Sequence, residues 1–348
     1  MIRFLDLRAV HEAIADELAA AVQRVVASGW YILGPEVEAF EAEWAAYVGA
    51  RHCVSVGNGL DALTLTLRAF GVGAGDEVVV PSHTFVATWL AVAATGATPV
   101  PAEVDPETFN LRSYEVGERT RAVIPVHLYG QPARYADADV PVVEDAAQAH
   151  GARLDGVRVG GHGVTACWSF YPGKNLGALG DGGAVTTDDP AVAQSLRLLR
   201  NYGSSRKYVH EQAGVNSRLD DVQAAALRVK LRHLDAWNAR RAEIAARYTE
   251  ALRDVVATPA VEPGSEPVWH LYVVRSPDRD GLAARLAERG VETLIHYPTP
   301  PHQQAAFATG ASLPVAERLA AEVLSLPMGP HLSDADVDAV IAAVRDAS

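Results

Sequence analysis

A single lysine, Lys174, follows a predicted strand in the segment SFYPGKNLGALGDGGAV, residues 169–185. The segment opens with alternating bulky and aromatic residues, which is typical of a strand, and then breaks into glycines. Burial lowers the pKa of a lysine, so an amine at the edge of a cleft can be neutral near pH 7 and act as nucleophile and base. The other interpretation is a solvated lysine in an ordinary loop.

Two carboxylates, Glu144 and Asp145, end the apolar segment VPVVEDAA, residues 140–147. A carboxylate that leaves a buried strand costs free energy unless a positive group meets it. A surface turn with an N-capping aspartate is the alternative. Because Asp145 and Lys174 both stand at strand ends of one predicted sheet, we expect them to converge on one cleft.

A glycine-rich turn, GNGLDAL (57–63), opens a predicted helix. The free N–H groups of Gly59, Leu60 and Asp61 would face an anion there, assisted by the helix dipole. The turn is neither a P-loop nor a dinucleotide fingerprint, and taken alone it is equally compatible with a purely structural turn. A lysine for a Schiff base, an aspartate for a protonated pyridine nitrogen and an anion site for a phosphate together suit pyridoxal 5′-phosphate (PLP).

The elements that must position these residues indicate an α/β fold with a mostly parallel sheet. Helices are predicted over 56–71 and 84–97, and strands over 76–82, 98–104, 121–130, 140–147, 164–171 and 182–188. Continuous apolar strands belong to sheets that are covered on both faces and bind ligands at the carboxyl ends.

The pattern changes after residue 220. One long helix is predicted over 218–252, then strands over 268–276 and 291–298 and helices over 280–290 and 334–346, which together make a small α+β unit. We therefore expect a large cofactor-binding domain over 1–235, N-terminal segment included, and a small C-terminal domain over 236–348.

The composition limits the possible partners. The chain has 348 residues and a net charge of −13, which argues against nucleic-acid binding. No apolar stretch reaches membrane length and the N-terminus has no secretory leader, so we expect a cytoplasmic protein. Two cysteines, and twelve histidines without an HxH or HExxH pair, predict no disulfide framework and no metal. The basic segment 197–210 is either a solvated surface or an anion-facing one.

Taken together, the motifs resemble the fold-type I, PLP-dependent nucleotide-sugar aminotransferases of the DegT/DnrJ/StrS family. The resemblance is carried, in order, by GNGLDAL, SHTFVATWLAV, VEDAAQAHGA, SFYPGKNLGALGDGGAV, RNYGS, NSRLDDVQAA and IHYPTPPH. It covers nearly the whole chain from residue 28. It is nearest to the branch that aminates C3 of dTDP-3-keto-6-deoxyhexoses, for sugars of the desosamine and mycaminose type.

The resemblance implies a role for each matching residue. Lys174 would bind the cofactor covalently and move the proton, Asp145 would pair with the pyridine nitrogen, and Gln148 would bind the ring hydroxyl. Phe85 would stack on the ring, and Ser169 with the Gly59 and Leu60 amides would bind the phosphate. Asn216 would reach the phosphate of a neighbouring subunit, which implies a homodimer with shared sites. The residues implied on the substrate side are His296 and Tyr297, with Tyr202 and His210 as further candidates; His83 would face the substrate or cap a helix.

Two positions refine the resemblance. Many relatives have threonine where Leu60 stands, and the C3 branch shares the leucine. A variant group with histidine in place of the lysine performs dehydration, which Lys174 excludes here. The expected reaction is transfer of the amino group of L-glutamate to the keto carbon of a dTDP-linked deoxysugar.

Three alternatives are weighed against that reaction. A C4-specific aminotransferase would need the same cofactor residues. An NAD-dependent oxidoreductase or epimerase would need the dinucleotide fingerprint, which is missing. A non-catalytic PLP-binding regulator would carry an added DNA-binding segment, for which the motif-bearing chain leaves no room.

Overall fold

Seven strands form the central sheet of the computed structural model, which describes residues 1–307 and 310–348. In spatial order they are β3 (Thr98–Ala102), β2 (Glu77–Pro81), β4 (Thr120–Val123), β5 (Val143–Asp145), β8 (Thr165–Ser169), β9 (Gly183–Thr187) and β1 (His52–Val56). Parallel bridges from Val123 to Val142 and from Val126 to Asp145 join the two halves between β4 and β5. Only β9 runs antiparallel to its neighbours, so the mostly parallel α/β sheet is confirmed.

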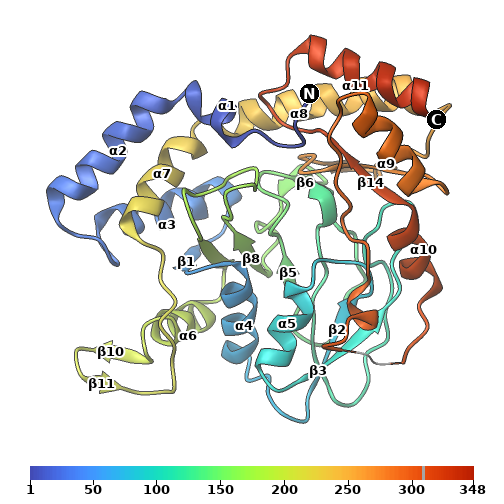
Figure 1. Ribbon diagram of the computed structural model, residues 1–348. Coiled ribbons are helices and arrows are strands. Elements are labelled where there is room, and N and C mark those ends of the chain that lie inside the picture. Colours follow the sequence, from blue (N-terminus) through green and yellow to red (C-terminus); the bar gives the residue numbers. More distant parts are fainter. Residues whose placement is uncertain (308–309) are drawn as a thin grey trace.

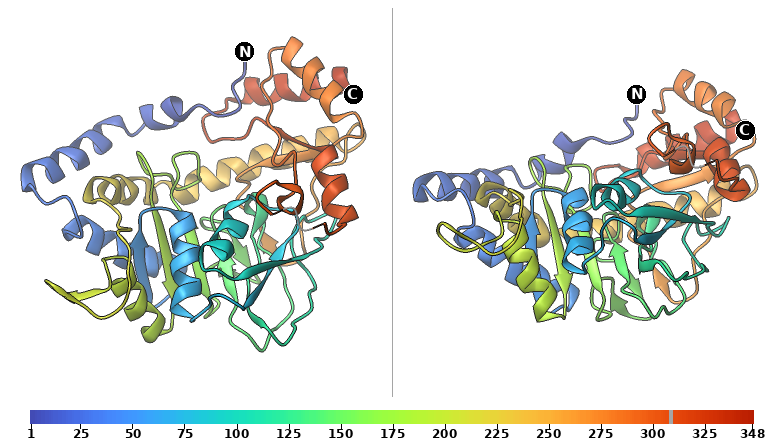
Figure 2. Two further views of the ribbon diagram at one scale, coloured as in Figure 1. Left: turned by 60° about the horizontal axis from the view of Figure 1, so that its bottom comes forward. Right: turned by 90° about the horizontal axis from the view of Figure 1, so that it is seen from below.

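Helices cover the sheet on both faces, as its apolar strands predict (Figures 1 and 2). The helices α4 (Gly59–Ala69), α5 (Ala87–Ala94) and α6 (Pro190–Leu199) pack on one face, and α3 (Pro35–Val48) packs on β1 with α7 (Asp221–Leu231) beside it. Residues of β8 alternate between the two cores, with Cys167 in one and Trp168 in the other. This alternation fixes which strand residues can face the site.

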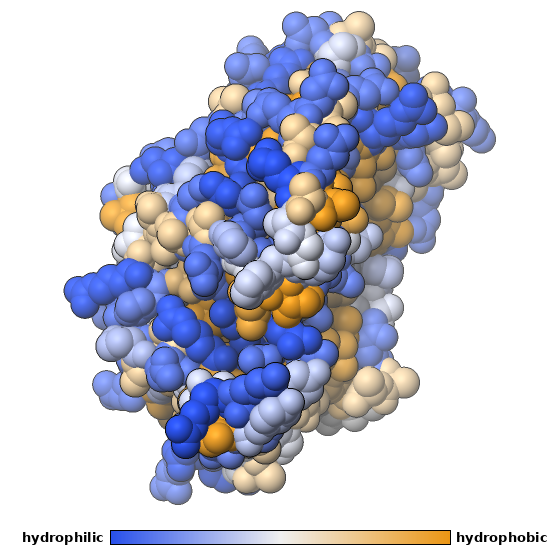
Figure 3. Space-filling view, turned by 90° about the vertical axis from the view of Figure 1, so that its left-hand side faces the viewer, coloured by the Kyte–Doolittle hydropathy of each residue, from blue (hydrophilic) through white to orange (hydrophobic). Residues whose placement is uncertain are grey.

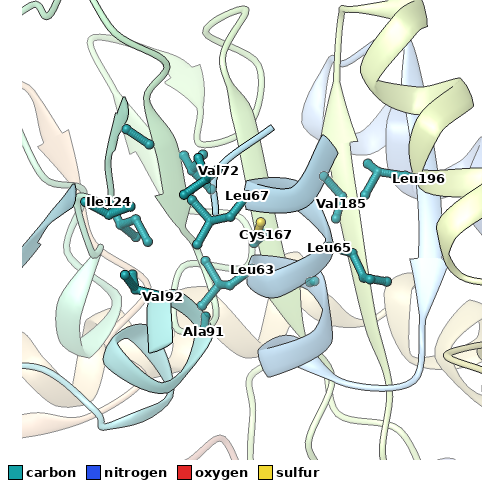
Figure 4. Packing of buried hydrophobic residues seen from close by; sticks show 14 of the residues in the cluster. Leu63, Leu65, Leu67, Val72, Ala91, Val92, Ile124, Cys167, Val185 and Leu196 are labelled. Carbon is teal, nitrogen blue, oxygen red and sulfur yellow. The ribbon is translucent and has the colours of Figure 1, made fainter. Parts of the chain in front are cut away.

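Helix α4 is the central element of the first core. Its start is capped by Asn58, whose side chain accepts a hydrogen bond of 2.8 Å from the N–H of Asp61. In Figure 4 the Leu63 and Leu67 side chains lie toward Ala91 and Val92 of α5, while Leu65 lies on the opposite side, toward Leu196 of α6. Its buried leucines thus hold the N-terminus of α4 at the carboxyl ends of the strands.

Two crossovers lack the helix that usually joins parallel strands. In the described chain, β3–β4 has only loop, and β4–β5 has only the 3₁₀ turn η1 (Leu128–Gly130). A small cluster of Val79, Leu111 and Val123 lies beneath these loops. The turn η1 follows β4, and its residues Leu128 and Tyr129 are buried.

The region after residue 220 departs from the prediction in two places. The single helix expected over 218–252 is wrong: α7 ends at Leu231 and α8 (Leu234–Leu252) begins after a short turn in which His233 N–H bonds to Lys230 O at 3.0 Å. The strand expected over 291–298 is also wrong, since only bridges at Val291 and Leu294 form. Prolines at 298, 300 and 301 follow, and proline cannot donate to a strand ladder.

The other C-terminal elements form a core of their own, except α10, whose Leu319 packs with Phe109 and Val126 of the large region. They are β13 (Tyr272–Arg275), paired antiparallel with β14 (Val323–Leu326), and the helices α9 (Arg279–Glu288), α10 (Pro314–Glu322) and α11 (Asp334–Ala347). Apolar residues of α8, α9, α11 and both strands share one buried cluster. The N-terminal residue Ile2 joins this region by pairing with Val291, and both termini lie at this end (Figure 1).

Short elements complete the chain. They are α1 (Leu7–Glu12), α2 (Ala15–Ser28), β6 (Arg153–Leu154), β7 (Val157–Arg158), β12 (Ser265–Glu266), η2 (Pro301–Gln303) and the hairpin of β10 (Ser204–Arg206) with β11 (Val209–His210). Helix α2 packs along α7 through Leu18 and Val25. Among the described helices, none combines the length and apolar character needed to cross a membrane.

Candidate active site

Lys174 lies in a tight loop that begins one residue after β8. The Lys174 N–H donates to Tyr171 O at 2.8 Å, and the Ala178 N–H returns the chain to Phe170 O at 2.8 Å. Protein atoms crowd the amine, and this burial lowers the Lys174 pKa to about 8, while the nearby Asp145 carboxylate opposes the shift. Lys174 is therefore partly neutral near pH 7 and lies close enough to Asp145 to interact electrostatically.

Asp145 is the last residue of β5 and is buried. Its carboxylate accepts hydrogen bonds from the Thr88 hydroxyl at 2.8 Å and from the Ala147 N–H at 3.2 Å. Burial raises the Asp145 pKa, and these two donors and Lys174 lower it in part. A buried carboxylate in this state is stabilised by a cation placed against it, which is what a protonated pyridine nitrogen provides.

The start of α4 provides an anion site. Among the described residues, the N–H groups of Gly59 and Leu60 have no hydrogen-bond acceptor. Gly59 lies so close to Ser169 that a Cβ at position 59 would be 2.6 Å from the Ser169 Cβ. Glycine at 59 therefore leaves two free amides and one hydroxyl close together, an arrangement that can hold an anion.

Gln148 is buried and held by a tyrosine that the sequence analysis missed. The Gln148 Oε1 accepts a 2.6 Å hydrogen bond from the Tyr129 N–H, so its Nε2 is the free donor. One of the two Nε2 hydrogens is donated to the Tyr297 hydroxyl at 3.1 Å, which leaves the second one available. Gln148 can thus donate to an acidic ring hydroxyl.

Phe85 and three further residues form the wall of the site. The Phe85 ring is 51 % exposed and lies 5.5 Å from the Tyr297 ring. His296 Nδ1 is 2.8 Å from the Ser325 hydroxyl, and burial lowers the His296 pKa to about 4. His83 is fully buried, with a pKa lowered to about 4 by burial and its Nε2 2.8 Å from the Tyr129 hydroxyl. Both histidines are neutral at physiological pH.

Of the remaining predicted residues, Tyr202 and His210 lie apart from this group, whereas Asn216 lies near the start of α4. Tyr202 O accepts from His210 Nδ1 at 2.9 Å at the base of the β10–β11 hairpin, which projects from the α6 edge (Figure 1). Asn216 is exposed and pairs with Asn201. The next residue, Ser217, accepts from the Gly57 N–H at 2.9 Å, so Asn216 lies near the start of α4.

Two supporting residues escaped prediction besides Tyr129. Thr88 lies three residues after Phe85 and binds Asp145. Asn175 follows Lys174, and its Nδ2 donates to Asn238 Oδ1 and Val268 O, both at 2.9 Å. Thr88 and Asn175 lie close in sequence to Phe85 and Lys174, and this was the only indication of their roles. Their hydrogen-bond partners belong to distant segments and could not be predicted.

The donor set fits PLP. An amine of lowered pKa, a buried carboxylate, free helix N-terminal amides and a half-exposed aromatic ring lie around one edge of the sheet. Two carboxyl-end loops and a helix N-terminus supply them, as expected for a ligand site in an open α/β sheet. The described residues contain no group of three or more His, Cys, Asp or Glu side chains arranged to hold a metal ion.

Comparison with known proteins agrees with this chemistry. The model of the DegT/DnrJ/EryC1/StrS aminotransferase family matches residues 12–345. The chain is 55 % identical to the erythromycin biosynthesis sensory transduction protein EryC1 of Saccharopolyspora erythraea, over 98 % of each chain. It is 53 % identical to the dTDP-3-amino-3,4,6-trideoxy-alpha-D-glucose transaminase of Streptomyces venezuelae, over 99 % of this chain and 95 % of the other.

A solved structure is equally similar. The crystal structure of S. venezuelae DesV in complex with a ketimine intermediate superposes with a TM-score of 0.95 at 51 % identity. The match covers 99 % of this chain and 98 % of that one. The fold-type I aminotransferase architecture predicted from the sequence is therefore confirmed.

Proposed function

The chain belongs to the DegT/DnrJ/EryC1/StrS aminotransferase family and is a PLP-dependent aminotransferase, and we propose that it transfers the amino group of L-glutamate to C3 of a dTDP-linked keto-6-deoxyhexose. The observation that carries the reaction class is the pairing of Lys174, with a pKa of about 8, with the buried Asp145. The sugar is proposed from the S. venezuelae transaminase, which is 53 % identical to this chain and is named for a dTDP-3-amino-3,4,6-trideoxyhexose.

Each cofactor contact has a residue to make it. When bound, PLP supplies the electron sink that allows an amino group to be exchanged for a keto group. Asp145 would hold a proton on the ring nitrogen, Gln148 Nε2 would donate to the ring hydroxyl, and Phe85 would pack against the ring. Gly59, Leu60 and Ser169 bind the phosphate through two amides and a hydroxyl.

Lys174 also handles the proton. Because burial lowers its pKa to about 8, its Nζ can accept a proton near neutral pH and return it without a large free-energy difference. A positioned group of this kind contributes ~10²- to 10⁴-fold to a rate. The neutral His296 is close enough to Lys174 for the charge of the amine to affect its pKa, and the Tyr297 hydroxyl interacts with Asp145. We assign both residues to the sugar side.

A second copy of the chain completes the proposed site. Exposed apolar side chains of Trp30, Tyr31 and Leu179 surround the start of α7, where Asp221 N–H donates to Tyr31 O at 2.9 Å. Figure 3 shows apolar groups among the hydrophilic surface on the side that carries α2 and α7. Such a patch favours a subunit contact. In the dimer, Asn216 and the hairpin residues Tyr202 and His210 of one subunit would serve the site of the other.

Three further features concern the domain boundary, the cellular location and the role of His83. The separate apolar cluster of α8, α9 and α11 supports a boundary near residue 235. The two cysteines, Cys53 and Cys167, are buried and unpaired, which supports a reducing, cytoplasmic location. His83 is assigned to the substrate side rather than to capping, because its Nε2 bonds to Tyr129 and not to a helix terminus.

The experiment uses the pyridoxamine phosphate form of the protein and a panel of ketosugars. A dTDP-linked 3-keto-6-deoxyhexose is expected to restore the PLP absorbance at least ~10-fold faster than a dTDP-linked 4-keto sugar or a UDP-linked 3-keto sugar. Faster reaction with the 4-keto sugar would make the enzyme C4-specific. A coloured protein that reacts with neither glutamate nor any sugar would support a regulator and refute the proposal.

A further inference from the structure

Tyr129 makes several polar contacts around the site, although it has no role in the proposed function. Its N–H donates to Gln148 Oε1 at 2.6 Å, and its carbonyl accepts from the Leu271 N–H at 3.2 Å. Its hydroxyl donates to the His296 carbonyl and contacts His83 Nε2 at 2.8 Å. One residue thus joins a cofactor-facing amide and a substrate-side histidine to two segments of the C-terminal region.

The backbone of Tyr129 is unusual. Its φ is 59° and its ψ is 6°, a left-handed conformation that residues other than glycine rarely adopt. A non-glycine residue keeps such a conformation when its surroundings impose it, and such residues are concentrated at functional sites. Here the contacts through the N–H, the carbonyl and the hydroxyl impose it, with the ring packed edge-on against Phe109 at 5.2 Å.

The hydroxyl contacts settle the protonation of His83. A tyrosine hydroxyl has one proton, and the His296 carbonyl can only accept, so this proton goes to His296. The Tyr129 oxygen must then accept from His83, which places the His83 proton on Nε2 and leaves Nδ1 as an acceptor.

We propose that Tyr129 is a positioning residue that fastens the His296–Tyr297 segment to the sheet edge and fixes His83 as the neutral Nε2–H tautomer. Gln148, His83 and His296 come from three separate segments, so without Tyr129 each of them would be positioned independently. Removing the Tyr129 hydroxyl leaves the buried His83 N–H without an acceptor and the His296 carbonyl without a donor. The consequence for turnover rests on the proposed function, whereas the tautomer does not.

The test compares Tyr129→Phe with the control Tyr248→Phe. Tyr248 is also fully buried, and its hydroxyl also donates to a carbonyl, that of Pro327 at 3.0 Å. In Tyr129→Phe, kcat/KM for the ketosugar half-reaction is expected to fall ~10- to 100-fold. The glutamate half-reaction should change less than ~3-fold, because the Gln148 contact uses the Tyr129 backbone. Equal losses in both variants would overturn the proposal.

The tautomer is measured directly by ¹H–¹⁵N spectra of histidine-labelled protein, with His83→Gln used to assign the signal. Wild type and Tyr248→Phe should show His83 protonated at Nε2, and Tyr129→Phe should show a mixture of tautomers. A wild-type His83 protonated at Nδ1 would overturn the proposal even if Tyr129→Phe does not fold. If no ketosugar reacts at all, the proposed function fails while the tautomer result still decides this inference.

Discussion

Two lysines of lowered pKa, the partly exposed Lys174 and the buried Lys230, differ in what surrounds them. Burial lowers the pKa of each to about 8. The Asp145 carboxylate acts on the pKa of Lys174, whereas no acidic group among the described residues acts on that of Lys230, which donates to the Gly177 carbonyl at 2.6 Å. Gly177 belongs to the loop that carries Lys174, so this hydrogen bond from Lys230 stabilises that loop. A lowered lysine pKa is therefore insufficient evidence of catalysis, and the neighbouring acid and anion site identify the reactive amine.

The largest expected effect is that of Lys174→Ala. This change removes the cofactor attachment and the proton-moving group together, so turnover should fall at least ~10⁴-fold, with loss of the visible absorbance of the bound cofactor. Lys230→Met, the matched change at the other lysine of lowered pKa, should keep the absorbance and measurable turnover. Turnover of Lys174→Ala comparable with that of Lys230→Met would remove the distinction between the two lysines.

Asp145→Ala should have the next largest effect. The variant leaves the protonated ring nitrogen without its buried partner, a loss of about 3–5 kcal/mol that corresponds to a fall of ~10²- to 10³-fold or more in turnover. Glu144→Gln is the control, because the adjacent Glu144 carboxylate instead accepts from the Tyr135 hydroxyl at 2.8 Å. Steady-state rates of both variants at saturating glutamate measure the difference, and an unchanged rate for Asp145→Ala would disprove its assigned partner.

The smallest effect concerns stability and pH at Lys230. Its pKa is lowered from 10.5 to about 8, so the folded chain binds fewer protons than the unfolded chain between these values, and wild-type stability rises with pH across that interval. Lys230→Met lacks this rise. Its free energy of unfolding relative to wild type should therefore fall by up to about 3 kcal/mol from pH 8 to pH 10.5.

Denaturant unfolding of both proteins at several pH values makes the measurement. A stability difference that does not change with pH would show that Lys230 keeps its ordinary pKa and is not buried as a cation. At pH 7, the difference in unfolding free energy between wild type and Lys230→Met reports the net contribution of the Lys230 side chain, including its contact with the Gly177 carbonyl.

Local signals account for the part of the site that the sequence predicted. Lys174 and Asp145 follow apolar strands, and Gly59 opens a helix, so each was recognisable from a short segment and its position at the carboxyl edge. Lys230 gave no such signal, because it lies in an Ala-, Leu- and Arg-rich helix that is also compatible with a solvated face. Its burial depends on how α7 packs against the Lys174 loop.

Contacts between distant segments account for the rest. Tyr129 belongs to an apolar segment whose pattern predicts only a strand, and its role depends on His296, more than 160 residues away along the chain. The break between α7 and α8 has no glycine or proline to mark it. The loops that replace helices in two crossovers were likewise not detectable, because the flanking strands have ordinary patterns.

The most direct measurement is borohydride reduction of the PLP-loaded protein, followed by peptide mass spectrometry of both lysine-bearing segments. Reduction fixes a pyridoxyl group to whichever amine is joined to the cofactor. The label is expected on Lys174 and absent from Lys230. A label on Lys230, or an unlabelled Lys174 in protein that retains cofactor, would contradict the account.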